Sequence, residues 1–373
     1  MQTLLRAANA AVLIEDRRIV RSDALLDLPR GAQLHDFGDA LLLPAFLDVH
    51  IHGSSGHDVM EDSPSGQIAM QKFLAAHGTA RFLPTTVTAP VEKTLRALEV
   101  LADWIEKNAS SEEPVARPVG IHLEGPFISH AKCGVQPVAH MQLPSCELFD
   151  RFWQAARGCI RLMTIAPELP GALDLIRHAS ARGVRVSLGH SDATAEQTRN
   201  GMAAGAVSAT HTFNAMRGFE AREPGLLGVV LDSRELYAEL ICDGHHVAPE
   251  ATRLFAACKP RERRILITDA ISATGEGDGE FQLGPMQVTV AGDRAMLDGK
   301  LAGSVLTLDR AVRRFASEAR LPLEEAAMAA GLNPAAMLGL ESGMDAGSRA
   351  DFVVLGETGE LRATFVGGEL VAA

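Results

Sequence analysis

The sequence predicts an α/β protein, a TIM-like (β/α)8 barrel with a small β-sandwich formed by the N- and C-terminal segments. Eight short apolar runs with strand character recur along the chain, and segments with helical periodicity separate most of them. The chain has 373 residues, whereas such a barrel takes about 250, so roughly 120 residues remain for a second unit. Both ends of the chain alternate apolar and polar residues in short bursts, which is typical of hairpin strands.

Each apolar run has the length of one strand of a parallel barrel. The eight runs are 45–51, 80–87, 118–125, 160–168, 184–191, 206–214, 236–244 and 263–270. Helical periodicity is clear in 90–107, 171–183 and 194–205, and the last of these follows Ser191 and Asp192, which favour an N-cap there. The connection 215–235 is interrupted by Gly and Pro and shows no clear helix.

The residues outside the barrel fall at the two ends and in one insertion. Residues 1–44 and 341–373 both predict hairpins, and the simplest arrangement pairs them in one small sandwich domain. Residues 45–340 then form the barrel domain. A third β-like patch at 280–297 predicts a hairpin inserted near 278–300, after the eighth strand.

Composition excludes several classes of protein. The net charge of −12 and the absence of a long basic run argue against a nucleic-acid partner and against binding to an anionic membrane. An apolar content of 47% excludes a disordered chain. Five scattered cysteines without a C-x-x-C motif favour reduced thiols, and no apolar run reaches the length of a membrane span or signal peptide. We therefore expect a cytoplasmic protein.

Side chains that bind metals stand at the C-terminal ends of five of the eight runs. They are His50 and His52, His122 and Glu124, His190, His211 and Asp269. Residues i and i+2 of a strand point to the same face, so both members of each pair can reach the barrel mouth, where barrel enzymes keep their active sites. One such histidine is more often structural, but convergence of so many on one rim predicts a divalent metal site, with Zn²⁺ or Fe²⁺ fitting these ligands best.

Asp269 differs from the other candidates because it closes the eighth run, opposite the expected metal. A metal can lower the pKa of a bound water to about 7, and a nearby carboxylate can then accept its proton and return it to a leaving group. We therefore expect Asp269 to be the catalytic acid and base, with a helix cap or an ion pair as the structural alternative.

A set of longer strings makes the chemistry more specific. The strings are PAFLDVHIHG, GIHLEGPF, SLGHSDAT, ATHTFNAM, REPGL, DGHHV, LITDAISATG and KLAGS. In order and spacing the chain resembles the N-acetylglucosamine-6-phosphate deacetylases of the amidohydrolase superfamily, from about residue 40 to 340 and more weakly at both ends.

The resemblance implies a metal centre and a dimer. Glu124, His190 and His211 match the primary metal ligands of the family, and Asp269 matches its catalytic acid and base. The pair His50 and His52 matches an H-x-H motif that holds a second metal in some members, so one or two divalent ions per chain are both possible. The ion itself, Zn or Fe or another divalent metal, is left open.

The resemblance also implies which residues contact an amino-sugar phosphate. They are Asn214, Ala215, Arg222, Asp243 and His246, together with the backbone of Leu301, Ala302 and Gly303. In this family the arginine can come from the neighbouring subunit of a homodimer, so Arg222 is expected to act within its own chain or across such an interface.

One stretch departs from the family pattern. After HLEGPF the family carries a histidine that polarises the amide carbonyl, whereas this chain reads KCGVQP, and we expect Gln136 in the place of the histidine with Val135 beside it. A glutamine amide can donate a hydrogen bond but cannot become cationic. Two hypotheses follow: a second metal on His50 and His52 supplies the missing polarisation, or Gln136 reads a different sugar or acyl group.

The expected reaction is hydrolysis of the N-acetyl group of an amino-sugar 6-phosphate, with N-acetyl-D-glucosamine 6-phosphate favoured as substrate. Two alternatives remain open at this point. The first is the same chemistry on N-acetylgalactosamine 6-phosphate or another N-acyl amine. The second is a non-catalytic sugar-phosphate sensor, against which the intact set of ligands and the carboxylate of Asp269 argue.

Overall fold

The eight apolar runs form one closed parallel barrel. The structure is a computed structural model that describes residues 2–371. The barrel strands are β6 (Phe46–Ile51), β9 (Thr79–Thr86), β11 (Ile121–Glu124), β12 (Ile160–Ile165), β13 (Arg185–Leu188), β14 (Ser208–Ala209), β15 (Tyr237–Ile241) and β16 (Arg264–Ile267). Neighbours along this series pair in parallel, and a parallel bridge between Ile51 and Ala270 closes the ring between its first and last strands. The predicted fold class is confirmed.

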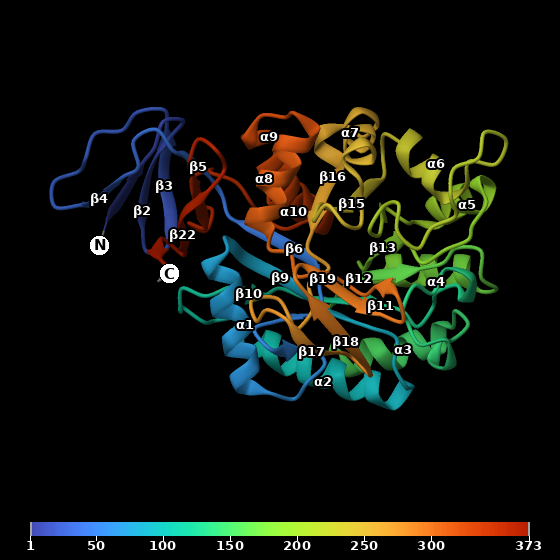
Figure 1. Ribbon diagram of the computed structural model, residues 1–373. Helices are drawn as coiled ribbons and strands as arrows, with labels where there is room; N and C mark the ends of the chain where they lie inside the picture. The colour runs from blue at the N-terminus through green and yellow to red at the C-terminus, as the bar shows by residue number, and fades with distance from the viewer. Residues whose placement is uncertain (1, 372–373) are drawn as a thin grey trace.

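Helices surround the barrel, as Figure 1 shows. They are α1 (Pro64–Ala76), α2 (Val91–Asn108), α3 (Cys146–Ala155), α4 (Ala172–Ala181), α5 (Ala195–Ala204), α6 (Gly225–Asp232), α7 (Pro249–Cys258), α8 (Leu308–Ala319), α9 (Leu323–Ala330) and α10 (Leu332–Leu338), with 3₁₀ turns at His130–Lys132, Val138–His140 and Arg261–Arg263. The three helices expected from periodicity are α2, α4 and α5. Helix α5 begins one residue beyond Thr194, whose hydroxyl accepts from Gln197 N–H in a capping box.

Helix α6 corrects the expectation for residues 215–235, where the sequence showed no clear helix. Its eight residues GLLGVVLD contain two glycines and two valines and offer hardly any polar face. The helix is stabilised by packing rather than by intrinsic propensity, because Leu226 and Val230 are completely buried. The sequence of α6 therefore has no amphipathic pattern from which a helix could be predicted.

The two ends of the chain supply two four-stranded sheets that lie together beside the barrel, with both termini near them (Figure 1). One sheet has the order β3-β2-β1-β4, from β1 (Thr3–Arg6), β2 (Ala11–Glu15), β3 (Arg18–Asp23) and β4 (Gln33–Asp36). The other has the order β23-β22-β21-β5, from β5 (Leu41–Pro44), β21 (Phe352–Leu355), β22 (Leu361–Val366) and β23 (Glu369–Leu370). Val12, Ile14, Phe352 and Phe365 share one apolar core, so both chain ends build the predicted sandwich.

The insertion after the eighth barrel strand lies where the hairpin was expected, near 278–300, but it has four strands. It is an antiparallel sheet of β17 (Gly279–Leu283), β18 (Met286–Ala291), β19 (Arg294–Leu297) and β20 (Lys300–Leu301). The chain leaves this sheet and returns to the barrel at Ser304, whose N–H donates to Asp269 O over 2.8 Å. Three short strands complete the described part: β7 (Gly53–Ser54), β8 (His57–Asp58) and β10 (Arg117–Pro118). Among residues 2–371, no helix is both long enough and apolar enough to cross a membrane.

Candidate metal centre and its cavity

Three of the expected ligands meet at one point above the barrel. Glu124 Oε1 lies 3.2 Å from His190 Nε2 and 3.2 Å from His211 Nε2, and the two Nε2 atoms are 3.1 Å apart. The residues come from the ends of β11, β13 and β14, which neighbour one another through the sheet order β11-β12-β13-β14. All three side chains are buried. The geometry brings together the set that the resemblance implied as primary ligands.

His50 and His52 complete a second group beside the first. Their Nε2 atoms are 3.3 Å apart, and His52 Nε2 lies 3.5 Å from Glu124 Oε2. His50 Nε2 lies 3.4 Å from Glu124 Oε1, so Glu124 stands between the two groups and belongs to both. Asp269 faces the second group, with its Oδ1 3.0 Å from His52 Nε2. In the described chain, these two groups are the candidate metal-binding clusters.

The hydrogen bonds of the four imidazoles show that the residues fit a cation. Each Nδ1 faces an oxygen that accepts: Lys132 O for His190, Asn214 O for His211, Thr85 O for His52 and the Glu239 carboxylate for His50. Nδ1 therefore carries the proton, and a neutral ring keeps its lone pair on Nε2. Lone pairs aimed at one another and at a carboxylate repel unless positive charge lies among them. Imidazole nitrogen with carboxylate oxygen is a donor set for Zn²⁺ and related divalent ions.

Opposite charges in the centre shift the pKa values of its titratable groups toward the charged forms. Burial acts to lower the pKa of His50, but the Glu124 and Asp269 carboxylates outweigh it and raise that pKa well above its ordinary value. Burial acts to raise the pKa of Glu124, but His50, His190 and His211 lower it well below the ordinary range. The carboxylates are thus ionised and require positive charge nearby, which a metal or a protonated imidazole can provide.

Asp269 is held at a fixed point of the rim by backbone hydrogen bonds on both sides. Its N–H donates to His50 O over 2.9 Å, and its carbonyl accepts from Ser304 N–H. Its φ is +51°, a left-handed conformation that non-glycine residues adopt rarely and that is often found at functional sites. Burial acts to raise the pKa of Asp269, yet His50 and His52 lower it to about 2. The side chain is therefore an ionised proton acceptor.

His122 does not join the cluster, although it shares a strand and a face with Glu124. Its Nδ1–H donates to Val49 O over 3.1 Å, and its Nε2 lies 2.8 Å from Thr164 Oγ1. Both ring nitrogens are therefore occupied inside the barrel. Burial, followed by the charge of His50, lowers the pKa of His122 well below its ordinary value and keeps the ring neutral. Its place is in the packed interior beneath the centre.

A cavity of about 170 Å³ opens above these groups, and most of the expected substrate residues line it. The lining includes Val135, Gln136, Asn214, Ala215, His246, Leu301 and Gly303 together with His52, Glu124, His190, His211 and Asp269. Ala302 is completely buried between Leu301 and Gly303, with its N–H donating to Ala295 O. The sequence did not reveal four apolar residues that also line the cavity, namely Val87, Ile241, Leu283 and Met286.

Gln136 has both polar ends engaged. Its Nε2 donates to Glu124 Oε2 over 2.8 Å, and its Oε1 accepts from Thr88 N–H over 2.7 Å. The backbone donor fixes which end of the amide faces Glu124, since an N–H can only be met by the carbonyl oxygen. Gln136 thus holds the carboxylate that both metal groups share, while Val135 beside it contributes its apolar surface to the cavity.

His246 faces the cavity with one ring nitrogen and is held by the other. Its Nδ1 lies 2.7 Å from Asp243 Oδ2, and Asp243 Oδ1 accepts from the N–H groups of His245 and His246. Burial acts to lower the pKa of His246, but the hydrogen bond and charge of Asp243 outweigh it and raise that pKa. Asp243 does not line the cavity itself, so its part in the site is to hold His246 and to favour its protonated form.

Arg222, the expected phosphate-binding arginine, also lies outside the cavity. It stands on an exposed stretch between β14 and α6, near Phe219, whose surface is 63% exposed. The remaining lining residues all belong to the barrel rim or to the inserted sheet. Within one chain, the cavity therefore lacks the arginine that the resemblance assigns to the phosphate.

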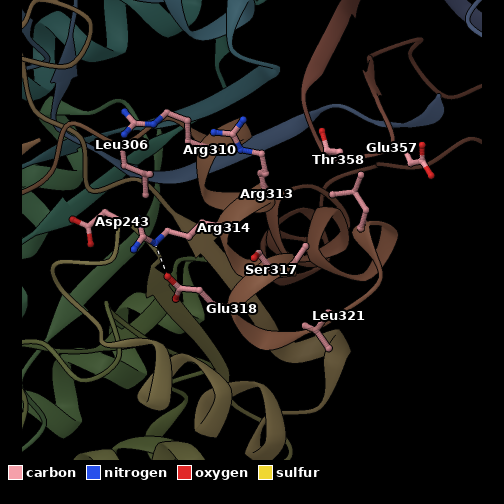
Figure 2. A pocket seen from close by; sticks show the side chains of 12 residues that line it. Asp243, Leu306, Arg310, Arg313, Arg314, Ser317, Glu318, Leu321, Glu357 and Thr358 are labelled. Carbon is pink, nitrogen blue, oxygen red and sulfur yellow. Dashed lines mark hydrogen bonds and ion pairs between the residues drawn. The ribbon is translucent and has the colours of Figure 1, made fainter. Parts of the chain in front are cut away.

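A wider groove of about 810 Å³ lies on the far side of Asp243 (Figure 2). Arg310, Arg313 and Arg314 of α8 line it, and Arg314 Nε donates to Glu318 Oε1 over 2.6 Å, the dashed line in Figure 2. Asp243, Glu318 and Glu357 also line the groove, so its three arginines face as many carboxylates. This groove offers neither a metal-binding cluster among the described residues nor a net charge.

Over most of its length the sequence is similar to proteins of one family. Residues 41–371 match the amidohydrolase family. N-acetylglucosamine-6-phosphate deacetylase from Homo sapiens is 37% identical over 99% of this chain and 94% of its own length. N-acetylgalactosamine-6-phosphate deacetylase from Escherichia coli is 38% identical over 89% of this chain and 88% of its own.

The solved structures give the same result in three dimensions. A mutant of N-acetyl-D-glucosamine-6-phosphate deacetylase from Mycobacterium smegmatis, in complex with N-acetyl-D-glucosamine-6-phosphate, superposes with a TM-score of 0.94. It is 34% identical, and the match covers 100% of both chains. The likeness therefore includes the barrel, the terminal sandwich and the inserted sheet.

Proposed function

The chain belongs to the amidohydrolase family, and we propose that it hydrolyses the N-acetyl group of an amino-sugar 6-phosphate, releasing acetate and the free amine. N-acetyl-D-glucosamine 6-phosphate is the favoured substrate, because most of the relatives carry that name and the full-length structural match was solved with that compound. The observation that carries the proposal is the convergence of Glu124, His190 and His211 with Asp269 in one small cavity.

Glu124, His190 and His211 would hold one divalent metal, and His50 with His52 would hold a second beside it. A metal there supplies Lewis acidity toward a water molecule and toward the amide carbonyl. The proton transfers are carried out by a residue of the chain itself. Asp269 accepts a proton from the attacking water at its carboxylate and donates it to the amide nitrogen, so that the amine leaves neutral.

The remaining residues bind and orient the substrate. His246, held cationic by Asp243, and Arg222 bind the phosphate by charge-assisted hydrogen bonds. The apolar side chains of Ile241, Leu283 and Met286 exclude water around the acetyl group. Gln136 keeps Glu124 in place through its 2.8 Å hydrogen bond rather than acting alone on the carbonyl.

Acetate release tests the proposal directly. Purified, metal-loaded protein is incubated with N-acetyl-D-glucosamine 6-phosphate, its galactosamine epimer and unphosphorylated N-acetyl-D-glucosamine, and acetate is measured. We expect turnover of the phosphorylated sugars and little of the unphosphorylated one. The Escherichia coli relative makes the galactosamine epimer the second candidate, and a higher kcat/KM for it would reassign the substrate. No acetate from any of them would refute the proposal.

We also propose that the protein works in the cytoplasm as a homodimer in which Arg222 enters the partner's cavity. The exposed position of Arg222 outside its own cavity supports this arrangement. Coexpressing an Asp269→Asn chain with an Arg222→Ala chain tests it. If the arginine acts across the interface, the mixed dimer has one complete site and recovers activity that neither variant has alone. If each chain uses its own arginine, no complete site forms.

A further inference from the structure

Glu239 is a buried carboxylate that none of the expected roles includes. It lies on β15, and its side chain has no exposed surface. Its Oε2 is 3.3 Å from His50 Nδ1 and accepts from His211 N–H over 3.3 Å. Glu239 therefore contacts one expected ligand from each of the two metal groups. Strand β15 places it behind the cavity, so it does not touch the space where a substrate would bind.

His50 is unlike the other three imidazoles in the partner that holds it. His52, His190 and His211 each direct Nδ1 at a neutral backbone carbonyl, whereas His50 directs Nδ1 at a carboxylate. A carboxylate on Nδ1 fixes the tautomer with Nε2 free and makes that Nε2 a stronger metal ligand. The difference is confined to the group that would hold the second metal.

The Glu239 carboxyl group has few other polar partners. Its Oε1 has no hydrogen-bond partner among the described residues. A buried carboxyl group needs hydrogen-bond donors, and His50 Nδ1–H and His211 N–H are the two that reach its Oε2. On the other side of the same imidazole, Glu124 Oε1 and Asp269 Oδ1 each lie 3.4 Å from His50 Nε2. Three carboxyl groups therefore surround His50.

We propose that Glu239 is a positioning residue that prepares His50 to bind the second divalent ion. This inference rests on the proposed function in that a second metal is taken to bind at His50 and His52. Glu239 orients His50, supplies negative charge behind it and, through His211 N–H, links the two groups. His52 and Glu124 complete the second group.

Glu239→Gln tests the role with little change of shape. The amide oxygen can still accept from His50 Nδ1–H and from His211 N–H, so only the charge is removed. The matched control is Glu235→Gln, the same chemical change on an exposed residue just before β15. Zn²⁺ binding to the metal-free proteins is measured by competition with a chelator, with the bound metal counted at each free concentration.

We expect two binding steps in the wild type and in the control variant. In Glu239→Gln the affinity of one step falls by about 10- to 100-fold while the other changes little. Unchanged affinities for both ions would overturn the proposal, as would equal weakening of both, which would indicate a general structural role. A wild-type protein that binds one ion would also overturn it.

A second measurement needs no variant. In the zinc-loaded wild type, long-range ¹H–¹⁵N correlation spectra report the tautomer of each histidine, with His50 assigned from a His50→Gln protein. A proton on His50 Nδ1 with the metal on Nε2 is expected, and an unprotonated Nδ1 contradicts the proposal even if Glu239→Gln fails to fold. Acetate release is measured on the same wild-type sample. If the protein releases acetate but Glu239→Gln leaves both Zn²⁺-binding steps unchanged, this inference alone is refuted. If the two Zn²⁺-binding steps behave as expected but no acetate is released, the proposed function alone is refuted.

Discussion

Gln136 Nε2 donates a hydrogen bond to Glu124 Oε2 over 2.8 Å, while Thr88 N–H holds the other end of the same amide. This contact changes how the missing histidine of the KCGVQP stretch is understood. Glutamine here stands against the carboxylate shared by both metal groups, so its first effect is on the position of a ligand. Partners of metal ligands contribute about 10- to 100-fold to metal affinity or activity when they are removed.

Gln136→Ala is therefore expected to lower kcat/KM by about 10- to 100-fold and to weaken metal binding together with it. The physical reason is that Glu124 loses its donor and gains freedom to rotate. Acetate release and chelator competition on the same preparation provide the measurement. Gln142→Ala, in the same connection but with its amide donating to His140 O, is the control. A loss of activity with metal affinity unchanged would place Gln136 on the substrate instead.

Asp269→Asn is expected to reduce kcat by about 10²- to 10⁴-fold, because an amide cannot accept the proton of the attacking water. Glu124, His190 and His211 are unchanged in this variant, so it should still bind metal. Metal content and kcat are measured together. Retained turnover in a metal-loaded sample would show that another group moves the proton.

Phosphate binding is expected to weaken as the pH rises. Burial opposes the charged form of His246, but Asp243 raises its pKa above the ordinary value. The cationic ring is then present below that raised pKa and is lost as the pH rises through it, so KM for the phosphorylated sugar should increase at alkaline pH. Asp243→Asn should move this increase toward lower pH. KM is measured across pH for the wild type and for Asp243→Asn, and KM should rise at a lower pH in the variant. With an unphosphorylated substrate, KM should not show this rise.

Gly303→Ala is expected to impair both stability and turnover. Gly303 has φ of +65°, and an added Cβ would collide with the Ile271 side chain and lie 2.9 Å from Asp269 O. The strained conformation costs about 1 to 3 kcal/mol, and the second contact displaces Asp269. Gly292→Ala isolates the φ effect, since Gly292 has the same φ of +65° with open space around it. We expect both variants to lose stability through φ, Gly303→Ala to lose more because of Ile271, and kcat to fall in Gly303→Ala alone.

The barrel strands and the convergence of the candidate ligands could be predicted because each depends on a local pattern. A buried parallel strand is a short apolar run, and its C-terminal end points to a common rim, so His190 and His211 could be placed together without coordinates. Helix α6 could not be predicted, because GLLGVVLD has no polar face and its stability comes from neighbours. His122 followed the right spacing but turned to Thr164 instead, a partner on another strand.

The role of Glu239 could not be predicted from the sequence for a different reason. It is one acidic residue in an otherwise apolar strand, and its partner His50 lies 189 positions earlier in the chain. The cavity walls from the inserted sheet could not be predicted either. In the sequence Leu283 and Met286 are two apolar residues of a hairpin, and only the fold places them over the barrel mouth. Long-range contacts of this kind carry no local signature.

The inserted sheet supplies part of the apolar cavity wall, whereas the barrel supplies the candidate metal ligands. Its first turn, between Leu283 and Met286, is held to β8 by Gly284 N–H, which donates to Asp58 Oδ2 over 2.6 Å. The candidate metal ligands lie in barrel strands or within two residues of their ends, whereas Leu283 and Met286 belong to the inserted sheet. The size of the acyl group that fits can therefore diverge by changes in a peripheral module, while the hydrolytic machinery beneath it is inherited unchanged.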